Sequence, residues 1–198
     1  MNVTDQATSA PTPFCFNRRK VKAIVLGADP TNFSDHSKPV KLSKAFGIGD
    51  GDPRYFQGIL SNLKSIGISL EDIYVTNVIS DQLEYETSKN KDWQLYAEKS
   101  LHRLIADLDG IDPKRKIPVF LTAEVIYKFM LYDDLEATSA KDLYSNPHAI
   151  PIDKENNKLG RYLIPLYRHP KYILSSVKWK GYRNRIIQLL NKNIEGNS

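Results

Sequence analysis

The sequence predicts an α/β domain built on a central, mostly parallel, four-stranded sheet. Short apolar runs alternate along the chain with longer segments in which apolar residues recur at helical spacing. This alternation is typical of a parallel sheet with helices on both faces, a three-layer α/β/α arrangement. The chain has 198 residues, of which 41% are hydrophobic, so one domain of ordinary size can bury a core. We expect a flexible polar leader over residues 1–13 and a single domain over residues 14–198.

The expected strands and helices follow one another in order. The first strand, 21–26, is a compact run rich in β-branched residues, and the others are 73–76, 117–121 and 161–167. Helices are expected from Pro53 to before Gly67 and over 93–108, 123–131 and 178–190. The segment 28–51 holds several Pro and Gly residues without a clear element, and a connection of this length is more often functional than filler.

Composition excludes several classes of protein. The sequence contains no run of eighteen apolar residues and no basic segment followed by an apolar one at its N-terminus, so we expect a soluble, cytoplasmic protein without a membrane partner. A single cysteine, Cys15, excludes an internal disulfide and a metal site built on several cysteines. We expect a monomer that requires no metal and no cofactor.

The positive charge is concentrated near the C-terminus. The formal net charge is only +5, yet residues 158–194 contain nine Lys and Arg residues and no Asp or Glu. One interpretation is a solvated helix face, because charge runs are usually solvated. The other is a track that binds the phosphates of a nucleic acid.

Three polar residues follow strands of the predicted sheet. Asp29 comes shortly after the first strand, Asn77 after the second and His169 after the fourth. Each residue type alone usually has a structural role, as a cap, a turn residue or a satisfied core group. In a parallel sheet, however, ligands bind at the carboxyl ends of the strands, and all three residues are expected there. Their joint placement predicts a site.

The residues around these positions resemble the motifs of the uracil-DNA glycosylases. The run 25–30, Val-Leu-Gly-Ala-Asp-Pro, resembles the water-activating Gly-Gln-Asp-Pro motif of that family, and Ala45-Phe46 resembles the segment whose Phe stacks on the base. The run 75–77, Val-Thr-Asn, resembles the strand end whose Asn reads uracil, and 168–170, Arg-His-Pro, resembles the start of the loop that enters DNA. The resemblance spans roughly residues 21–190, and it implies hydrolysis of the N-glycosidic bond of uracil, or of a related damaged base, in DNA.

The resemblance also implies a role for each residue of the site. Asn77 would accept a hydrogen bond from uracil N3–H and donate one to O4, and Phe46 would stack on the base. Because cleavage leaves positive charge on the sugar and negative charge on the base, Asp29 would orient water and favour the cationic sugar. His169 would donate a hydrogen bond to uracil O2.

The chain departs from the family pattern at three places. Ala28 stands in place of the usual Gln. Thr31 and Asn32 stand where the family has Tyr-His, and Thr31 is too small to fill the space of the Tyr that blocks the methyl group of thymine. In the loop after His-Pro, Ile173 is the nearest candidate for the apolar wedge.

The basic tract flanks this loop and would lie beside DNA, single- or double-stranded, that enters the site. Arg168, Lys171 and Lys178 are the candidate phosphate contacts. Three alternatives stay open. The chain could be a diverged family member that acts on another base or only binds nucleic acid, an unrelated α/β enzyme acting on a nucleotide or small sugar, or a scaffold without a site.

Overall fold

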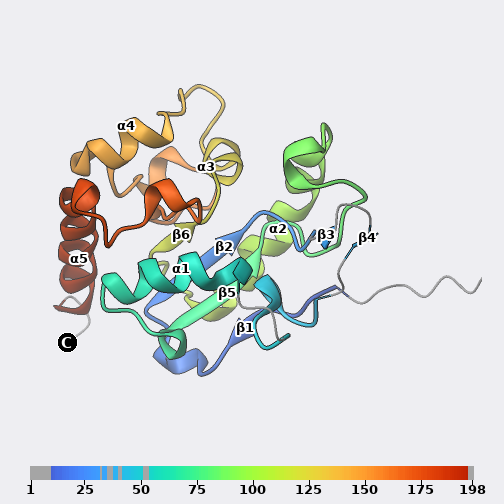
Figure 1. Cartoon of the computed structure of the whole chain (residues 1–198), viewed down its shortest axis with the longest axis horizontal. Coiled ribbons are helices and arrows are strands. Elements are labelled where there is room, and N and C mark those ends of the chain that lie inside the picture. Colours follow the sequence, from blue (N-terminus) through green and yellow to red (C-terminus); the bar gives the residue numbers. More distant parts are fainter. Residues whose placement is uncertain (1–9, 32, 35–37, 40–41, 51–53, 196–198) are drawn as a thin grey trace, which may run out of the picture.

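The computed structural model describes residues 10–31, 33–34, 38–39, 42–50 and 54–195. Its described residues form an α/β fold around a five-stranded sheet in the order β1-β5-β2-β6-β7 (Figure 1). The strands are β1 (Phe14–Cys15), β5 (Ile73–Asn77), β2 (Ala23–Gly27), β6 (Val119–Leu121) and β7 (Leu163–Pro165). β5, β2, β6 and β7 run parallel, and β1 pairs antiparallel with β5. The predicted mostly parallel sheet is therefore confirmed, with five strands in place of four.

The additional strand, β1, lies at the edge of the sheet. Phe14 and Cys15 pair with Val75 and Tyr74 of β5. A strand of two residues is too short to carry the alternating pattern that identifies strands in a sequence, so β1 was not predicted. The chain is already paired before β1, because the amide of Thr12 donates to the carbonyl of Ser43 at 3.0 Å. Of the predicted leader over residues 1–13, residues 1–9 lie outside the described part of the chain.

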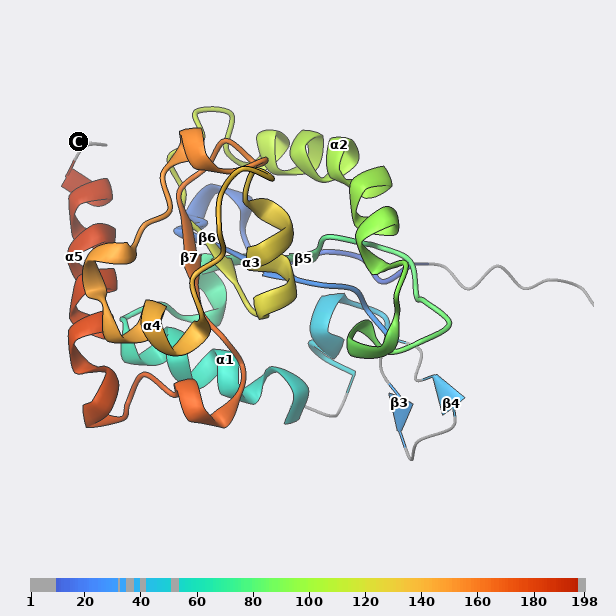
Figure 2. The same ribbon diagram turned by 90° about the horizontal axis from the view of Figure 1, so that it is seen from above.

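Helices lie on both sides of the sheet. They are α1 (Arg54–Ser65), α2 (Trp93–Ile111), α3 (Glu124–Met130), α4 (Ala140–Ser145) and α5 (Lys180–Glu195). Figure 2 shows α1 and α2 on opposite sides of the strands, with α5 at the end of the molecule away from β3 and β4. Pro53, which was expected to open α1, lies outside the described residues. None of the described helices has both the length and the apolar character needed to cross a membrane.

Short elements occur where the sequence predicted connections. The segment 28–51 contains a two-stranded ribbon of β3 (Phe33–Ser34) and β4 (Lys38–Pro39), followed by a 3₁₀ turn over Ala45–Gly47. The polar connection after α3 contains α4, whose residues Leu143 and Tyr144 are buried, and the Tyr144 ring stacks on Tyr182 of α5 with centroids 4.2 Å apart. Six residues carry too little periodicity to predict such a helix.

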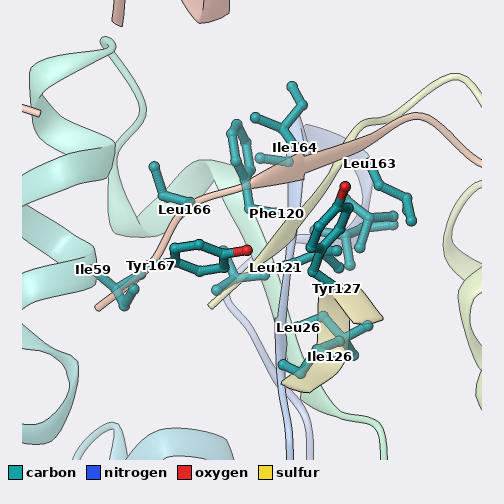
Figure 3. Packing of buried hydrophobic residues seen from close by; sticks show 14 of the residues in the cluster. Leu26, Ile59, Phe120, Leu121, Ile126, Tyr127, Leu163, Ile164, Leu166 and Tyr167 are labelled. Atoms are coloured by element: carbon teal, nitrogen blue, oxygen red, sulfur yellow. The ribbon is translucent and has the colours of Figure 1, made fainter. Parts of the chain in front are cut away.

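The core fills the space between the sheet and its helices. All residues of β2, β5, β6 and β7 are buried, which explains why these strands appear in the sequence as continuous apolar runs. Leu26, Leu121 and Ile126 belong to one packed cluster (Figure 3). Complete burial of an aliphatic side chain of this size stabilises the fold by about 1.5–3 kcal/mol.

The register of the parallel strands brings their carboxyl ends to one edge. Gly27, at the end of β2, is the partner of Asn77 at the end of β5. The amide of Thr122 donates to the carbonyl of Leu26 at 3.1 Å, and the amide of Arg168 donates to the carbonyl of Thr122 at 3.2 Å. The chain segments that leave the four parallel strands therefore start side by side, as the site prediction requires.

Candidate active site

A pocket of about 50 Å³ lies at the carboxyl edge of the parallel strands. This volume exceeds the roughly 10–15 Å³ that one water molecule occupies on the same kind of measure. The residues that line the pocket come from the ends of β2, β5 and β6 and from the segments that follow these strands and β7. They are Gly27, Ala28, Asp29, Pro30, Leu42, Phe46, Asn77, Thr87, Thr122, Ala123 and Arg168. Five of the ten residues predicted from the sequence are therefore brought together here.

Asp29 is buried at the pocket wall and its carboxylate is held by hydrogen bonds. Only 5% of the residue is exposed. Its Oδ2 accepts from Thr87 Oγ1 at 2.6 Å and from Trp93 Nε1 at 3.0 Å, and its Oδ1 accepts from the amide of Thr31 at 2.9 Å. These donors compensate the loss of hydration that burial of a carboxylate entails.

The side-chain amide of Asn77 is buried and faces the pocket without a protein partner. The residue is 8% exposed, and no hydrogen bond joins its side chain to another described residue. A Cβ atom at Gly27 would lie 2.2 Å from Asn77 Oδ1, so only glycine allows the amide to lie this close to β2. The amide atoms of Asn77 are not among the fully buried side-chain atoms without a partner, so they remain accessible from the pocket and can pair with a ligand there.

Phe46 forms a second wall of the pocket in an unusual backbone conformation. Its φ of 60° and ψ of 12° lie in the left-handed region, which residues other than glycine adopt at a cost of roughly 1–3 kcal/mol. The ring packs on Phe56 with centroids 5.2 Å apart, and its edge lies over Gly27. The backbone strain at Phe46 therefore coincides with the placement of an aromatic ring beside Asn77.

Ala28 and Thr31 have different positions relative to the pocket. Ala28 lines it, and its carbonyl accepts from the amide of Ile79 at 3.0 Å. Thr31 is buried outside the lining, and its hydroxyl accepts from the amide of Leu83 at 2.8 Å. The side chain of Thr31 therefore joins two loops. Asn32 lies outside the described residues.

His169 is exposed and does not line the pocket, whereas its neighbour Arg168 does. The ring Nδ1 of His169 accepts from the amide of Lys171 at 3.2 Å. In the neutral ring this bond assigns the hydrogen to Nε2, which is then the nitrogen available as a donor.

The loop after His169 is anchored on α1. Asn62, which is buried in α1, accepts from the amide of Leu174 at 2.8 Å and donates to the carbonyls of Tyr167 and Tyr172. Leu174 is fully buried and Ile173 is half-buried, so the candidate wedge at Ile173 has only part of its side chain at the surface.

The predicted phosphate contacts beyond Arg168 lie on the surface. Lys171 and Lys178 are exposed, and the ammonium of Lys178 lies 4.4 Å from the centroid of the Trp179 ring. Neither lysine forms an ion pair with a carboxylate among the described residues. Both cations are therefore available to an anionic partner.

Several site residues were not predicted from the sequence. Thr87 lies 58 positions from Asp29 in the chain, in a polar stretch without a strand or a recognisable motif. The sequence predicts Trp93 only as the first residue of the helix expected over 93–108, although an indole N–H usually has a buried acceptor. Leu42 and Thr122 line the pocket from segments that carried no polar motif.

The part of the chain that the structure describes contains no group of three or more His, Cys, Asp or Glu residues placed to hold a metal ion. Comparison of the sequence with known protein families and with curated proteins found no match.

Proposed function

We propose that this protein is a DNA glycosylase that hydrolyses the N-glycosidic bond of uracil, or of a related damaged base, in DNA. We also propose that the fold is a three-layer α/β/α domain similar to the uracil-DNA glycosylases. The motif resemblance supports it, together with the way in which the matching residues gather at one edge of the sheet.

One observation carries the proposal: the buried Asn77 amide has no hydrogen-bond partner among the described residues and faces a pocket beside an aromatic ring. A planar base with an N–H donor next to a carbonyl acceptor matches the acceptor and donor of that amide. In the orientation that the structure gives this amide, with Oδ1 toward Gly27, cytosine presents the opposite pair of groups and would leave both partners unpaired. Stacking on Phe46 contributes roughly 1–3 kcal/mol, comparable to the cost of taking the base out of the duplex.

The chemical step in this proposal is carried by two residues. Asp29 orients the attacking water and stabilises positive charge on the sugar. The hydrogen bonds that its carboxylate accepts hold it in one orientation. His169 donates from Nε2 to the base oxygen as negative charge develops there. Because catalytic hydrogen bonds often tighten only when substrate is bound, the exposed position of His169 in the free protein is compatible with this role.

The basic tract provides the contact with DNA. Lys171 and Lys178 are exposed and have no carboxylate partner among the described residues, and Arg168 connects their loop to the pocket. Neutralisation of phosphates by such side chains releases counterions and gives most of the affinity for nucleic acid.

A second candidate is a diverged protein that binds nucleic acid without excising uracil. It is favoured by the position of His169, which is exposed and outside the pocket lining. In this case Asp29 would be a structural tie between loops, and the three donors around its carboxylate would be sufficient to explain its burial.

The experiment that separates the two uses labelled oligonucleotides containing uracil, thymine opposite guanine, or hypoxanthine, in single- and double-stranded form. Abasic sites are converted to strand breaks by alkali after incubation. The glycosylase proposal predicts breaks at uracil that fall by about 100-fold in an Asp29→Asn variant. An absence of breaks on every substrate, with DNA affinity retained, favours the second candidate.

Asp29→Asn also replaces a hydrogen-bond acceptor with a donor, so its folding needs a control. The thermal unfolding temperature of this variant is compared with that of the parent protein. His169→Ala serves as the second active-site variant, because His169 is exposed and its removal leaves the core unchanged. If both variants release uracil as fast as the parent protein, the proposed mechanism is wrong.

A further inference from the structure

The hydrogen bonds of Asp29 leave little freedom for a catalytic water. A carboxylate has about four acceptor sites. Among the described residues, Thr87, Trp93 and the amide of Thr31 occupy three of them. One acceptor site of Asp29 therefore remains for a water or a substrate atom. The three donors that occupy the other sites determine where the remaining site lies.

The two side-chain donors to Oδ2 have different surroundings. Trp93, the first residue of α2, is buried, and its ring packs edge-on against Phe129 with centroids 5.6 Å apart. This packing fixes the indole N–H in the core. Thr87 is half-buried and lines the same pocket as Asp29 and Asn77.

Thr87 therefore contacts both the carboxylate and the space where a ligand would lie. Its hydroxyl donates to Asp29 Oδ2 at 2.6 Å, a short bond of the kind that carboxylates form with hydroxyl donors. The same oxygen keeps two lone pairs with which it can accept from a water or a ligand in the pocket.

We propose that Thr87 is a positioning residue that sets the orientation of the Asp29 carboxylate toward its water, with Trp93 as the fixed anchor of the same oxygen. This inference rests on the proposed glycosylase function and assigns residues to it that neither the sequence motifs nor the resemblance contain. Orientation errors of about 1 Å cost about 100-fold in rate, so loss of the hydroxyl affects the chemical step more than substrate binding.

The test compares Thr87→Val, which keeps the shape and removes the hydroxyl, with Thr87→Ser, which keeps the hydroxyl. Single-turnover uracil release is measured as a function of protein concentration, so that the maximal rate and the half-saturating concentration are obtained separately. We expect the maximal rate of Thr87→Val to fall by about 10- to 100-fold, with the half-saturating concentration changed by less than about threefold. Thr87→Ser should retain the maximal rate within about threefold of the parent, because the donor is kept.

Two results would overturn the inference while the proposed function stands. One is a parent maximal rate in Thr87→Val. The other is an equal loss in Thr87→Val and Thr87→Ser, which would show that keeping the hydroxyl does not preserve the rate. If the parent protein releases no base from any substrate, the proposed function itself fails, and the role of Thr87 fails with it.

Discussion

The two ends of the parallel strands use their buried polar groups in opposite ways. At the amino end, the guanidinium of Arg161 donates to Asp112 Oδ2 and to Asp109 Oδ1, each at 2.8 Å, and Arg115 pairs with Asp109 at 2.6 Å. At the carboxyl end, the Asn77 amide has no partner among the described residues, and Phe46 has a strained backbone.

This difference separates residues that stabilise the fold from residues available to a ligand. Arg161 is 1% exposed, and its pairing with Asp112 satisfies both charges within the protein. Asn77 is nearly as buried, yet its hydrogen-bonding groups remain available in a pocket. Variants of the paired residues at the amino end should therefore change stability, and variants of Asn77 at the carboxyl end should change activity.

The largest effect is expected for Arg161→Met. Loss of the guanidinium leaves Asp112 as a buried charge without its partner, which costs about 3–5 kcal/mol in the free energy of unfolding. Urea denaturation measures this cost. The matched control is Arg115→Gln, whose pair with Asp109 is partly exposed and should contribute about 0–1 kcal/mol. An equal loss in the free energy of unfolding for both variants would show that the buried and the partly exposed ion pair contribute alike.

The reverse pattern is expected for Asn77→Ala. Because its amide has no protein partner to lose among the described residues, the free energy of unfolding should change by less than about 1 kcal/mol. Uracil release should fall by about 100-fold, since the base loses its specific hydrogen bonds. Denaturation and base release are measured on the same preparation. A large loss of stability with little loss of activity would show that Asn77 stabilises the fold and does not bind the base.

Gly27→Ala tests the close approach at the carboxyl edge. The new Cβ would lie 2.2 Å from Asn77 Oδ1 and 2.6 Å from Phe46 Cζ, so both side chains must shift, at a cost of about 1–3 kcal/mol in stability together with a loss of activity. Gly110→Ala in α2 is the control, because nothing lies within 4 Å of its added Cβ. This control should be neutral or slightly stabilising, and destabilisation of both variants to the same extent would contradict the account.

The basic loop should affect DNA affinity alone. Lys171→Gln and Lys178→Gln should each lower the slope of log affinity against log salt by about 1, without a change in thermal stability. Fluorescence anisotropy of a labelled oligonucleotide between low and moderate salt provides the slope. Lys128→Gln on α3 is the control, since that lysine is paired with Glu124 at 2.9 Å and lies outside the tract. If the slope of log affinity against log salt is the same in all three variants as in the parent protein, this loop does not contact DNA.

The smallest effect concerns Asp72 at the amino end and depends on pH. Burial opposes ionisation of Asp72, but hydrogen bonds from Ser69 and Lys22 outweigh it and lower its pKa to about 2. Because the unfolded value is about 4, the charged form favours folding, and this contribution is complete above about pH 4 and disappears as the pH falls to about 2.

Asp72→Asn should therefore be less stable than the parent by about 1 kcal/mol at neutral pH, with a difference that shrinks as the pH falls from 4 to 2. Denaturation curves at a series of pH values provide the test. A difference that stays constant over this range would show that the carboxylate charge has no part in it.

The sequence predicts the strands and the polar residues at their ends, because continuous apolar runs and the strand-end rule are local signals. It makes β7 too long by two residues at each end, because Arg161 turns toward Asp112 before the strand begins and the strand ends at Pro165. It misses the contacts between Asp29 and Thr87 and Trp93, which join residues 58 and 64 positions apart. Such contacts depend on how loops pack after the strands have formed, and no local pattern encodes them.

We expect the pocket at the carboxyl edge to bind a nucleobase through Asn77. Titration of the isotope-labelled protein with free uracil, followed by nuclear magnetic resonance, tests it most directly. We expect uracil to shift the side-chain amide signals of Asn77 and the backbone amide signal of Gly27, and cytosine at the same concentration to leave both unchanged. Signals of both residues that stay unmoved at saturating uracil, or that move equally with cytosine, would contradict it.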